Sequence, residues 1–373
     1  MNEDRSSRYH RLRRRAAVAS TVVAAAWLAW LQISGWSGAL AAWAVSASAS
    51  LAWPLRPMLA VALVSGAVAL GWEVLSLPLV FYRTFLLDRK YGLSSEPAGT
   101  WFADHLKALA LGLVLTLGSA IAVYVTIKLS PQTWWLLAAG LFVAAAAAIS
   151  GIAPIWLMPL FYRFRPLERE ALRERLLTLS ARAGVPVLGA FEWGLGEKTT
   201  RANAALVGAG RTRRILVSDT LLKDYSDDEI EVILAHELAH HVYRDIWTAL
   251  ALEAVLIAVA LYGAHVAATS LSPALGLAGP ADLAALPLLI LAGGGVSLLL
   301  APVSNAWSRH NERRADRFAL TQTRRADAFV TAMRRLGAQN LAEERPSRLV
   351  FWFLHTHPTM DERIASAREF KSA

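Results

Sequence analysis

Cysteine is absent from all 373 residues of the chain. Disulfide bonds and thiolate metal sites are therefore excluded, and histidine and carboxylate side chains remain as the ligands for any metal. Charge is scarce as well, because Asp, Glu, Lys and Arg make up 18% of the residues while hydrophobic residues make up 55%. This balance is typical of a membrane protein.

Charge is missing altogether from several long stretches of the chain. They are residues 16–55, 108–127, 129–162, 254–281 and 283–308, and the run 58–82 holds only Glu73. A helix needs about 20 apolar residues to cross a bilayer. We therefore expect about six spans, at residues 16–36, 58–82, 108–127, 134–157, 246–270 and 283–306.

Residues 38–53 leave a seventh span open. The segment is apolar, but it is shorter than a normal crossing. Its Ser and Ala content also suits a helix that lies in the membrane interface. Both interpretations fit the sequence.

The arginines near the start of the chain predict its orientation in the membrane. Six of them precede the first apolar run: Arg5, Arg8, Arg11, Arg13, Arg14 and Arg15. The positive-inside rule places them in the cytoplasm, and the run that follows is too long for a secretory signal, so we expect a retained first span. Six spans return the chain to its starting side. Both termini, residues 163–245 and the region after residue 307 are then expected to be cytoplasmic.

The net charge of +9 has the same origin. The arginines cluster beside hydrophobic runs, where they set topology and contact anionic lipid. No motif supports binding to nucleic acid. The expected partner is the lipid bilayer, and nucleic acid is not expected as a partner.

The chain therefore reads as a mainly α-helical, polytopic membrane protein with a region of ordinary soluble sequence between the fourth and fifth spans. Helical periodicity at 167–183 and short β-type runs at 190–193 and 214–218 predict a small β-sheet there. The expected division is an N-terminal membrane region (1–158), a cytoplasmic region (159–245), two further spans (246–306) and a cytoplasmic C-terminal region (307–373).

The stretch ILAHELAHHVYRD, residues 233–245, carries an HExxH motif. Ser226 and Glu229 form a capping-box pattern, which predicts that the motif lies on a helix. His236 and His240 are then one turn apart on one face and can bind one zinc ion, with Glu237 beside it as a general base. The bare motif also occurs by chance on soluble helices, so its context has to decide.

A catalytic zinc site needs a third protein ligand. The segment SRHNERRAD follows the last expected span, and it places Glu312 and Asp316 one turn apart on a probable helix. Glu312 can bind the metal while Asp316 accepts a hydrogen bond from a ligand histidine. Without the HExxH motif, two acids among arginines would be interpreted as a solvated helix face.

These motifs together resemble the type I CAAX prenyl endopeptidases and their bacterial relatives, which are integral-membrane zinc metalloproteases of the gluzincin class. The resemblance covers about residues 81–364. Its further pieces are YRTF and KYG after the second span, PLF to PL at 159–167, RANA at 201–204, RRI to DTLL at 213–222, and HPTMDER at 357–363.

The resemblance implies roles for individual residues. His236, His240 and Glu312 would bind one zinc ion per chain, and Glu237 would be the base. Asn203 would hold the substrate backbone, His357 would support the tetrahedral oxyanion, and Arg363 would lie near the site or near a substrate carboxylate. Without the family, Asn203 reads as a turn cap, His357 as part of a helix start and Arg363 as a partner of Asp361 or Glu362. Ala239 departs from the family's usual glycine.

The leading hypothesis is a zinc-dependent membrane endopeptidase that cleaves peptide bonds of membrane-associated or hydrophobic protein substrates. Strand 214–218 would align the extended substrate. The alanine- and arginine-rich composition suggests a bacterial inner-membrane protein, for which CAAX removal is not the expected reaction. A non-proteolytic, zinc-containing membrane binding or quality-control protein is the alternative. A transporter is the third, because Glu73, Glu253 and His265 fall within expected spans.

Overall fold

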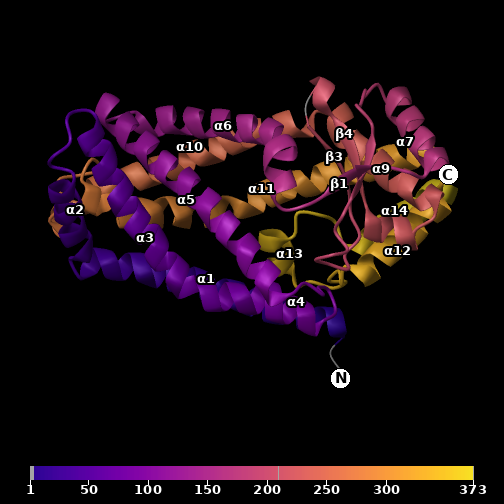
Figure 1. Cartoon of the computed structure of the whole chain (residues 1–373), viewed down its shortest axis with the longest axis horizontal. Helices are drawn as coiled ribbons and strands as arrows, with labels where there is room; N and C mark the ends of the chain where they lie inside the picture. The colour runs from indigo at the N-terminus through magenta and orange to yellow at the C-terminus, as the bar shows by residue number, and fades with distance from the viewer. Residues whose placement is uncertain (1–3, 209, 373) are drawn as a thin grey trace.

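Long helices occupy one end of the molecule, and a small sheet covered by helices occupies the other (Figure 1). The computed structural model describes residues 4–208 and 210–372. Within them, six helical stretches are long and apolar enough to cross a membrane. They are α1 (Arg5–Ile33), α3 (Leu55–Phe81) running on into α4 (Leu87–Lys90), α5 (Ala98–Leu129), α6 (Trp134–Ile152) with its extension to Leu160, α10 (Asp245–Leu271) and α11 (Leu286–Thr323).

The six predicted spans are thus confirmed as membrane-length helices. The segment proposed as a seventh folds mainly into α2 (Trp36–Ala47), a helix of 12 residues. At 1.5 Å of rise per residue such a helix is about 18 Å long, too short for a hydrocarbon layer of about 30 Å. The structure therefore supports six spans.

Close packing against α10 fixes the position of α11, and the C-terminal half of α11 carries part of the site. A Cβ atom added at Gly263 of α10 would lie 2.8 Å from Cγ2 of Val296 on α11. Only glycine permits the two helices to approach so closely at this point, as small residues do at helix contacts in membranes. Trp134, Val64 and Ala264 belong to the apolar core that these spans share.

The sheet has four strands in the order β1-β2-β4-β3. Strands β2 (Ala190–Trp193) and β4 (Arg214–Ser218) pair in parallel, and β1 (Phe164–Pro166) and β3 (Ala204–Val207) add antiparallel edges. The two predicted strands are confirmed. The segment between them holds β3, which forms an antiparallel hairpin with β4.

This topology corrects one expectation. Strand β4 pairs with β2 on one side and with β3 on the other, so both of its backbone edges are occupied. It cannot align a substrate strand, because no main-chain donor or acceptor row is left on it. Each of the two edge strands, β1 and β3, has one such row that is not paired within the sheet.

Helices cover the sheet and enclose the second core. They are α7 (Glu170–Arg182), α8 (Asp219–Asp224), α9 (Asp227–Val242), α12 (Ala326–Gln339) and α14 (Met360–Ser372), with the short α13 (Arg348–Leu354) nearer the spans. Leu176, Ile215, Ile230, Leu234 and Phe329 are fully buried in this core. It holds α9 between the sheet and the C-terminal helices.

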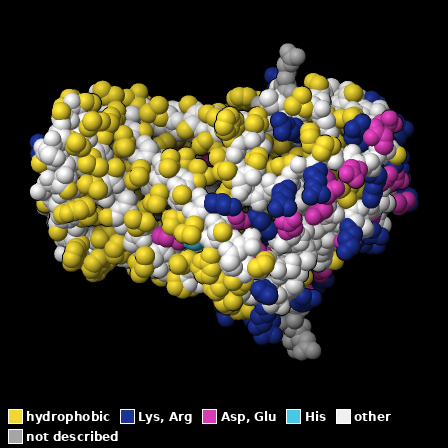
Figure 2. All heavy atoms as spheres, in the orientation of Figure 1, with side chains coloured by type: hydrophobic (Ala, Val, Ile, Leu, Met, Phe, Trp, Pro, Cys, Tyr) yellow, Lys and Arg dark blue, Asp and Glu magenta, His cyan; other side chains and the backbone are white. Residues whose placement is uncertain are grey.

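Surface chemistry follows the same division. Figure 2 shows hydrophobic side chains over the part built from the long helices, while Lys, Arg, Asp and Glu gather at the end with the sheet. Helix α1 begins and helix α14 ends at this charged end (Figure 1). An even number of spans returns the chain to the side where it starts, which agrees with α1 beginning and α14 ending at the same end of the molecule.

Helix α9 starts with the predicted capping box. The Ser226 hydroxyl accepts from the N–H of Glu229, and the Glu229 carboxylate accepts from the N–H of Ser226. We expect Ser226→Ala to lower the free energy of unfolding by about 1 kcal/mol, because backbone donors of α9 lose their acceptor. Thermal unfolding of the detergent-solubilised protein checks this. Ser226→Thr keeps an acceptor and is the matched control; equal loss in both variants would contradict the capping role.

Candidate metal centre

Three ligand-type side chains meet where α9 packs against α11. His236 and His240 of α9 and Glu312 of α11 offer nitrogen and oxygen atoms that all lie within 4.8 Å of one another. The Nε2 atom of His236 is 3.1 Å from Oε2 of Glu312, and Nε2 of His240 is 3.5 Å from Oε1. The spacing of four residues puts both imidazoles on one face of α9, as expected from the motif.

The surroundings of Glu312 fit a metal ion. Its Oε2 atom is buried and has no hydrogen-bond partner among the described residues, although His236 lies close to it. A buried carboxylate oxygen without a partner is costly, and a cation between the three side chains would satisfy it. Nitrogen and carboxylate oxygen donors also suit a divalent transition metal.

The electrostatics of His236 point the same way. Burial alone would disfavour its charged form, but the neighbouring carboxylates of Asp316 and Glu312 outweigh this and raise the pKa of His236 to about 9. The pocket therefore favours a positive charge at this position. A metal ion bound to the neutral imidazole supplies that charge in place of the proton.

A carboxylate orients each ligand imidazole from behind. Nδ1 of His236 lies 2.9 Å from Oδ1 of Asp316, and Nδ1 of His240 lies 2.8 Å from Oδ2 of Asp245. Since a carboxylate only accepts, each Nδ1 donates the proton and each Nε2 is left as the metal-binding atom. The predicted contact between Asp316 and a ligand histidine is present.

Arg363 of α14 fixes Asp316 in turn. Its Nε and Nη2 atoms donate to the two carboxylate oxygens at 2.9 and 2.6 Å, and Nη2 is 3.3 Å from Nδ1 of His236. Both side chains are buried. Arg363 thus lies near the site, one of its two expected placements, and its ion pair is with Asp316, not with Asp361 or Glu362.

Glu237 follows the first ligand on α9 and is half-buried. Burial raises the pKa of its carboxyl group above the usual value, while the neighbouring histidines oppose this. A carboxylate with a raised pKa is a stronger base than an exposed one. Glu237 thus stands next to His236 in the helix, with a carboxyl group whose pKa is raised.

His357 reaches the same centre from the loop before α14. Its Nε2 atom is 3.4 Å from Oε1 of Glu312, and its side chain is exposed, so it can meet a ligand from solvent. Asn203 is different. Among the described residues its backbone pairs with Ser218 at the entry to β3, and its exposed side chain is not joined to the metal-binding group.

The edge strand is nevertheless tied to the metal helix. Nε2 of His241 lies 2.9 Å from the carbonyl oxygen of Leu206 in β3, and a carbonyl can only accept, so the imidazole donates. This bond holds β3 beside α9. An extended peptide paired with β3 would therefore pass along the helix that carries His236 and His240.

Sequence reasoning missed Asp245 as the residue that orients His240. Asp245 is the first residue of α10 and is buried, and Arg314 of α11 donates to its other oxygen. The available signal was an acid five residues after the second ligand histidine. That spacing lies outside the helical i+3 and i+4 rule, so it predicted no contact.

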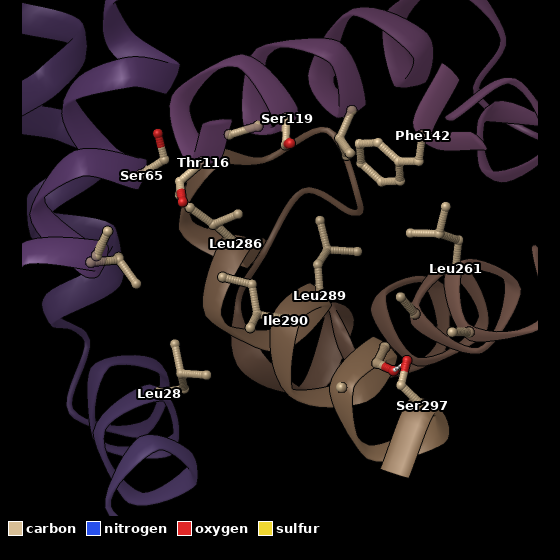
Figure 3. A pocket seen from close by; sticks show the side chains of 18 of the residues that line it. Leu28, Ser65, Thr116, Ser119, Phe142, Leu261, Leu286, Leu289, Ile290 and Ser297 are labelled. Atoms are coloured by element: carbon tan, nitrogen blue, oxygen red, sulfur yellow. Dashed lines mark hydrogen bonds between the residues drawn. The ribbon is translucent and has the colours of Figure 1, made fainter. Parts of the chain in front are cut away.

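The acids and histidines expected within the spans have partners in the structure. Glu73 pairs with His105 at 2.7 Å, Ser304 donates to Glu253 at 2.6 Å, and Trp134 donates to Nδ1 of His265 at 3.0 Å. A cavity of about 730 Å³ also lies among the spans (Figure 3). No ionisable side chain lines this cavity, so it offers no metal ligands of the kind found at the α9–α11 contact.

Models of two protein families match this chain. The model for peptidase family M48 matches residues 166–371, and the model described as CAAX prenyl protease N-terminal, five membrane helices, matches residues 2–163. The described part of that second range holds four membrane-length helices and α2.

Curated relatives and one solved structure extend the match. The protein named Uncharacterized metalloprotease YhfN, of Bacillus subtilis, is 31% identical over 76% of this chain and 67% of its own length. The Probable CAAX prenyl protease 1 of Schizosaccharomyces pombe is 28% identical over 78% of this chain, which spans 62% of that protein. The crystal structure of Ste24p from S. mikatae has a TM-score of 0.79 at 22% identity, over 97% of this chain and 87% of that one.

The two orienting carboxylates give a test of the centre. We expect Asp316→Asn and Asp245→Asn each to weaken metal binding about 10- to 100-fold, because the imidazoles lose the acceptors that fix their orientation. Competition of the purified protein against a chromophoric chelator measures this. Asp327→Asn removes an exposed carboxylate and is the control; unchanged affinity in both site variants would refute the orienting role.

Proposed function

The chain belongs to peptidase family M48, and from this we propose that it is an integral-membrane zinc endopeptidase that hydrolyses peptide bonds of membrane-associated or hydrophobic protein substrates. The observation that carries the proposal is the group of His236, His240 and Glu312 with Glu237 beside it. Three protein ligands leave a coordination position for water, which is the pattern of a catalytic site and not of a structural one.

Zinc is the metal that this ligand set favours. Two imidazoles and one carboxylate, without thiolates, form the donor set of many zinc peptidases. When bound, zinc would act as a Lewis acid toward the scissile carbonyl and make water a better nucleophile. One ion per chain follows from the single group of ligands found in the described residues.

The chain's own residues would move the protons. Glu237 takes a proton from the attacking water and passes it to the nitrogen of the leaving amine, so the carboxylate is regenerated in each cycle. His357, exposed and close to Glu312, donates a hydrogen bond to the carbonyl oxygen as negative charge develops there. Asp316 acts through His236, whose orientation it fixes.

Substrate binding falls to the edge of the sheet. The edge of β3 that faces away from β4 can pair with an extended peptide by main-chain hydrogen bonds, except at the Leu206 carbonyl, which already accepts from His241. Asn203 precedes this strand and is exposed, which suits a contact with the substrate backbone. Arg363 is already paired with Asp316. Its part in substrate binding would therefore be to hold the metal site in shape.

We place the active site and both termini on the cytoplasmic side of a bacterial inner membrane. The six arginines at the start of α1 and the six membrane-length helices support this orientation through the positive-inside rule. Membrane proteins and their fragments are the substrates that a site at this boundary meets. Turnover or processing of such proteins fits better than removal of CAAX tails.

A non-proteolytic zinc protein that sequesters hydrophobic segments is the second candidate. It would need no base, and Glu237 beside the ligands speaks against it. A fourth protein ligand that closes the metal would favour it, because structural zinc sites are closed. The group found in the described residues has three.

The base gives the sharpest test of the reaction. We expect Glu237→Gln to retain zinc and to lose at least about 10³-fold in kcat, because the amide cannot accept the proton of the attacking water. Cleavage of casein or of a fluorogenic peptide by the protein in detergent measures the loss. Metal analysis of the same sample is the control, and cleavage at the wild-type rate would exclude the proposed reaction.

Metal removal tests the choice of zinc. Treatment with 1,10-phenanthroline should abolish cleavage, and one equivalent of zinc should restore it, since the three ligands alone supply no Lewis acid. Magnesium should not restore it, because Mg²⁺ prefers an all-oxygen octahedral site. Full activity of the chelated protein would contradict a metal-dependent reaction.

A further inference from the structure

Helix α13 is an apolar surface that the reaction described above does not use. All of its side chains but that of Arg348 are hydrophobic, and none of its residues is buried. The most exposed are Leu349 (75%), Trp352 (60%), Leu354 (58%) and Phe353 (41%). Exposed apolar patches of this kind mark sites that bind a protein, a ligand or a membrane.

Polar bonds hold this surface firmly in place. Nδ2 of Asn305 donates to the carbonyl of Phe353 at 2.7 Å, and Nη1 of Arg309 donates to the carbonyls of Phe351 and His355 at 3.2 and 2.6 Å. The guanidinium of Arg309 is buried and also lies over the Phe351 ring, 4.6 Å from its centroid. These bonds supply hydrogen-bond donors to the last backbone carbonyls of α13. The apolar side chains of the helix remain exposed.

The anchors of α13 and the metal-site residues share one face of α11. Asn305, Arg309, Glu312 and Asp316 follow each other at intervals of four, three and four residues, which is one stripe along a helix. Helix α13, which Asn305 and Arg309 hold, therefore packs on the side of α11 that carries the metal centre. It sits toward the membrane from that centre, because Asn305 precedes Glu312 in a helix that comes from the spans.

Most of the exposed apolar residues on this part of α11 lie on a different side of the helix. They are Leu299, Val303 and Trp307, while exposed Leu298 lies on the side of Asn305. At about 100° per residue, this stripe points roughly opposite to the stripe of Asn305 and Glu312. Helix α13 thus packs on a different side of α11 from Leu299, Val303 and Trp307.

Helix α11 also sets the distance between the anchor of α13 and the metal centre. Seven residues separate Asn305 from Glu312, which is about 10 Å along α11. An extended peptide advances about 3.3 Å per residue, so about three residues cover that span. The chain itself connects the two places, because His357 follows α13 after two residues.

We propose that α13 is the specificity surface of the active site, and that it binds apolar side chains of the peptide substrate about three residues from the scissile bond. The proposal rests on the proposed peptidase function. It assigns Trp352 and its exposed neighbours to substrate selection, with Asn305 and Arg309 as the residues that position them. Peptides with apolar residues at that distance are then preferred over polar ones.

Kinetic selectivity is the first test. Two fluorogenic peptides are compared that differ only in Leu against Ser at the third position from the cleaved bond, on either side. We expect Trp352→Ser to lower the wild-type ratio of kcat/KM for the two peptides about tenfold, mainly through KM for the Leu peptide. The ratio does not depend on how much protein is folded. Leu188→Ser, an equally exposed leucine on the soluble region, should leave the ratio unchanged.

A binding test is independent of catalysis. Because the chain has no cysteine, Trp352→Cys in a Glu237→Gln background accepts a single polarity-sensitive fluorophore in nanodiscs. The Leu peptide should shift its emission to the blue at concentrations where the Ser peptide does not. Absence of cleavage by the wild type alongside this shift would refute the peptidase function and leave the binding surface standing.

Other results would overturn the proposal. Equal shifts with both peptides, or none, would show that α13 does not select apolar residues. Quenching of the fluorophore by brominated lipid tails in the absence of peptide would assign the surface to the bilayer. A shift that depends on protein concentration alone would assign it to a second copy of the chain.

Discussion

The buried ion pair between Arg363 and Asp316 is the interaction on which the metal centre depends. It joins α14 to α11, and through His236 it joins both to α9. A charge buried without a partner costs several kcal/mol, so each of these two residues requires the other. The three helices must be assembled together before Asp316 can accept from His236. Metal binding and the packing of the C-terminal region are therefore coupled.

The second ligand histidine depends on a sharp change of direction between α9 and α10. Arg244 takes a left-handed conformation with φ of 56°, an uncommon one for a side chain of this kind. Tyr243 caps the end of α9, and Arg244 caps the start of α10 and turns Asp245 back toward His240. Local backbone strain thus serves a specific purpose, since it lets one short connection supply the orienting carboxylate.

Local signals made the helix of the site predictable. The capping box, the HExxH spacing and the long apolar runs each act within a few residues, and the structure has all of them. Partners far apart in the chain were harder to predict. Arg363 had nearby acids at 361 and 362, yet it pairs with an acid 47 residues away. Strand β3 is as short as β2, but its sequence AALV has no aromatic residue and one β-branched residue, so it gives a weaker strand signal. Its pairing with β4 is set by the tertiary fold.

Helix α11 sets how far the chemistry lies from the membrane interior. It is one helix of 38 residues, and it contributes Ser297 to the cavity among the spans and Glu312 to the metal centre. Fifteen residues of helix separate the two, or about 22 Å. An extended peptide would need about seven residues to cover that length. A group held in the cavity is thus too far from the metal centre to touch the scissile bond. Helix α13 is bound to α11 at Asn305 and Arg309, between the cavity and the metal centre.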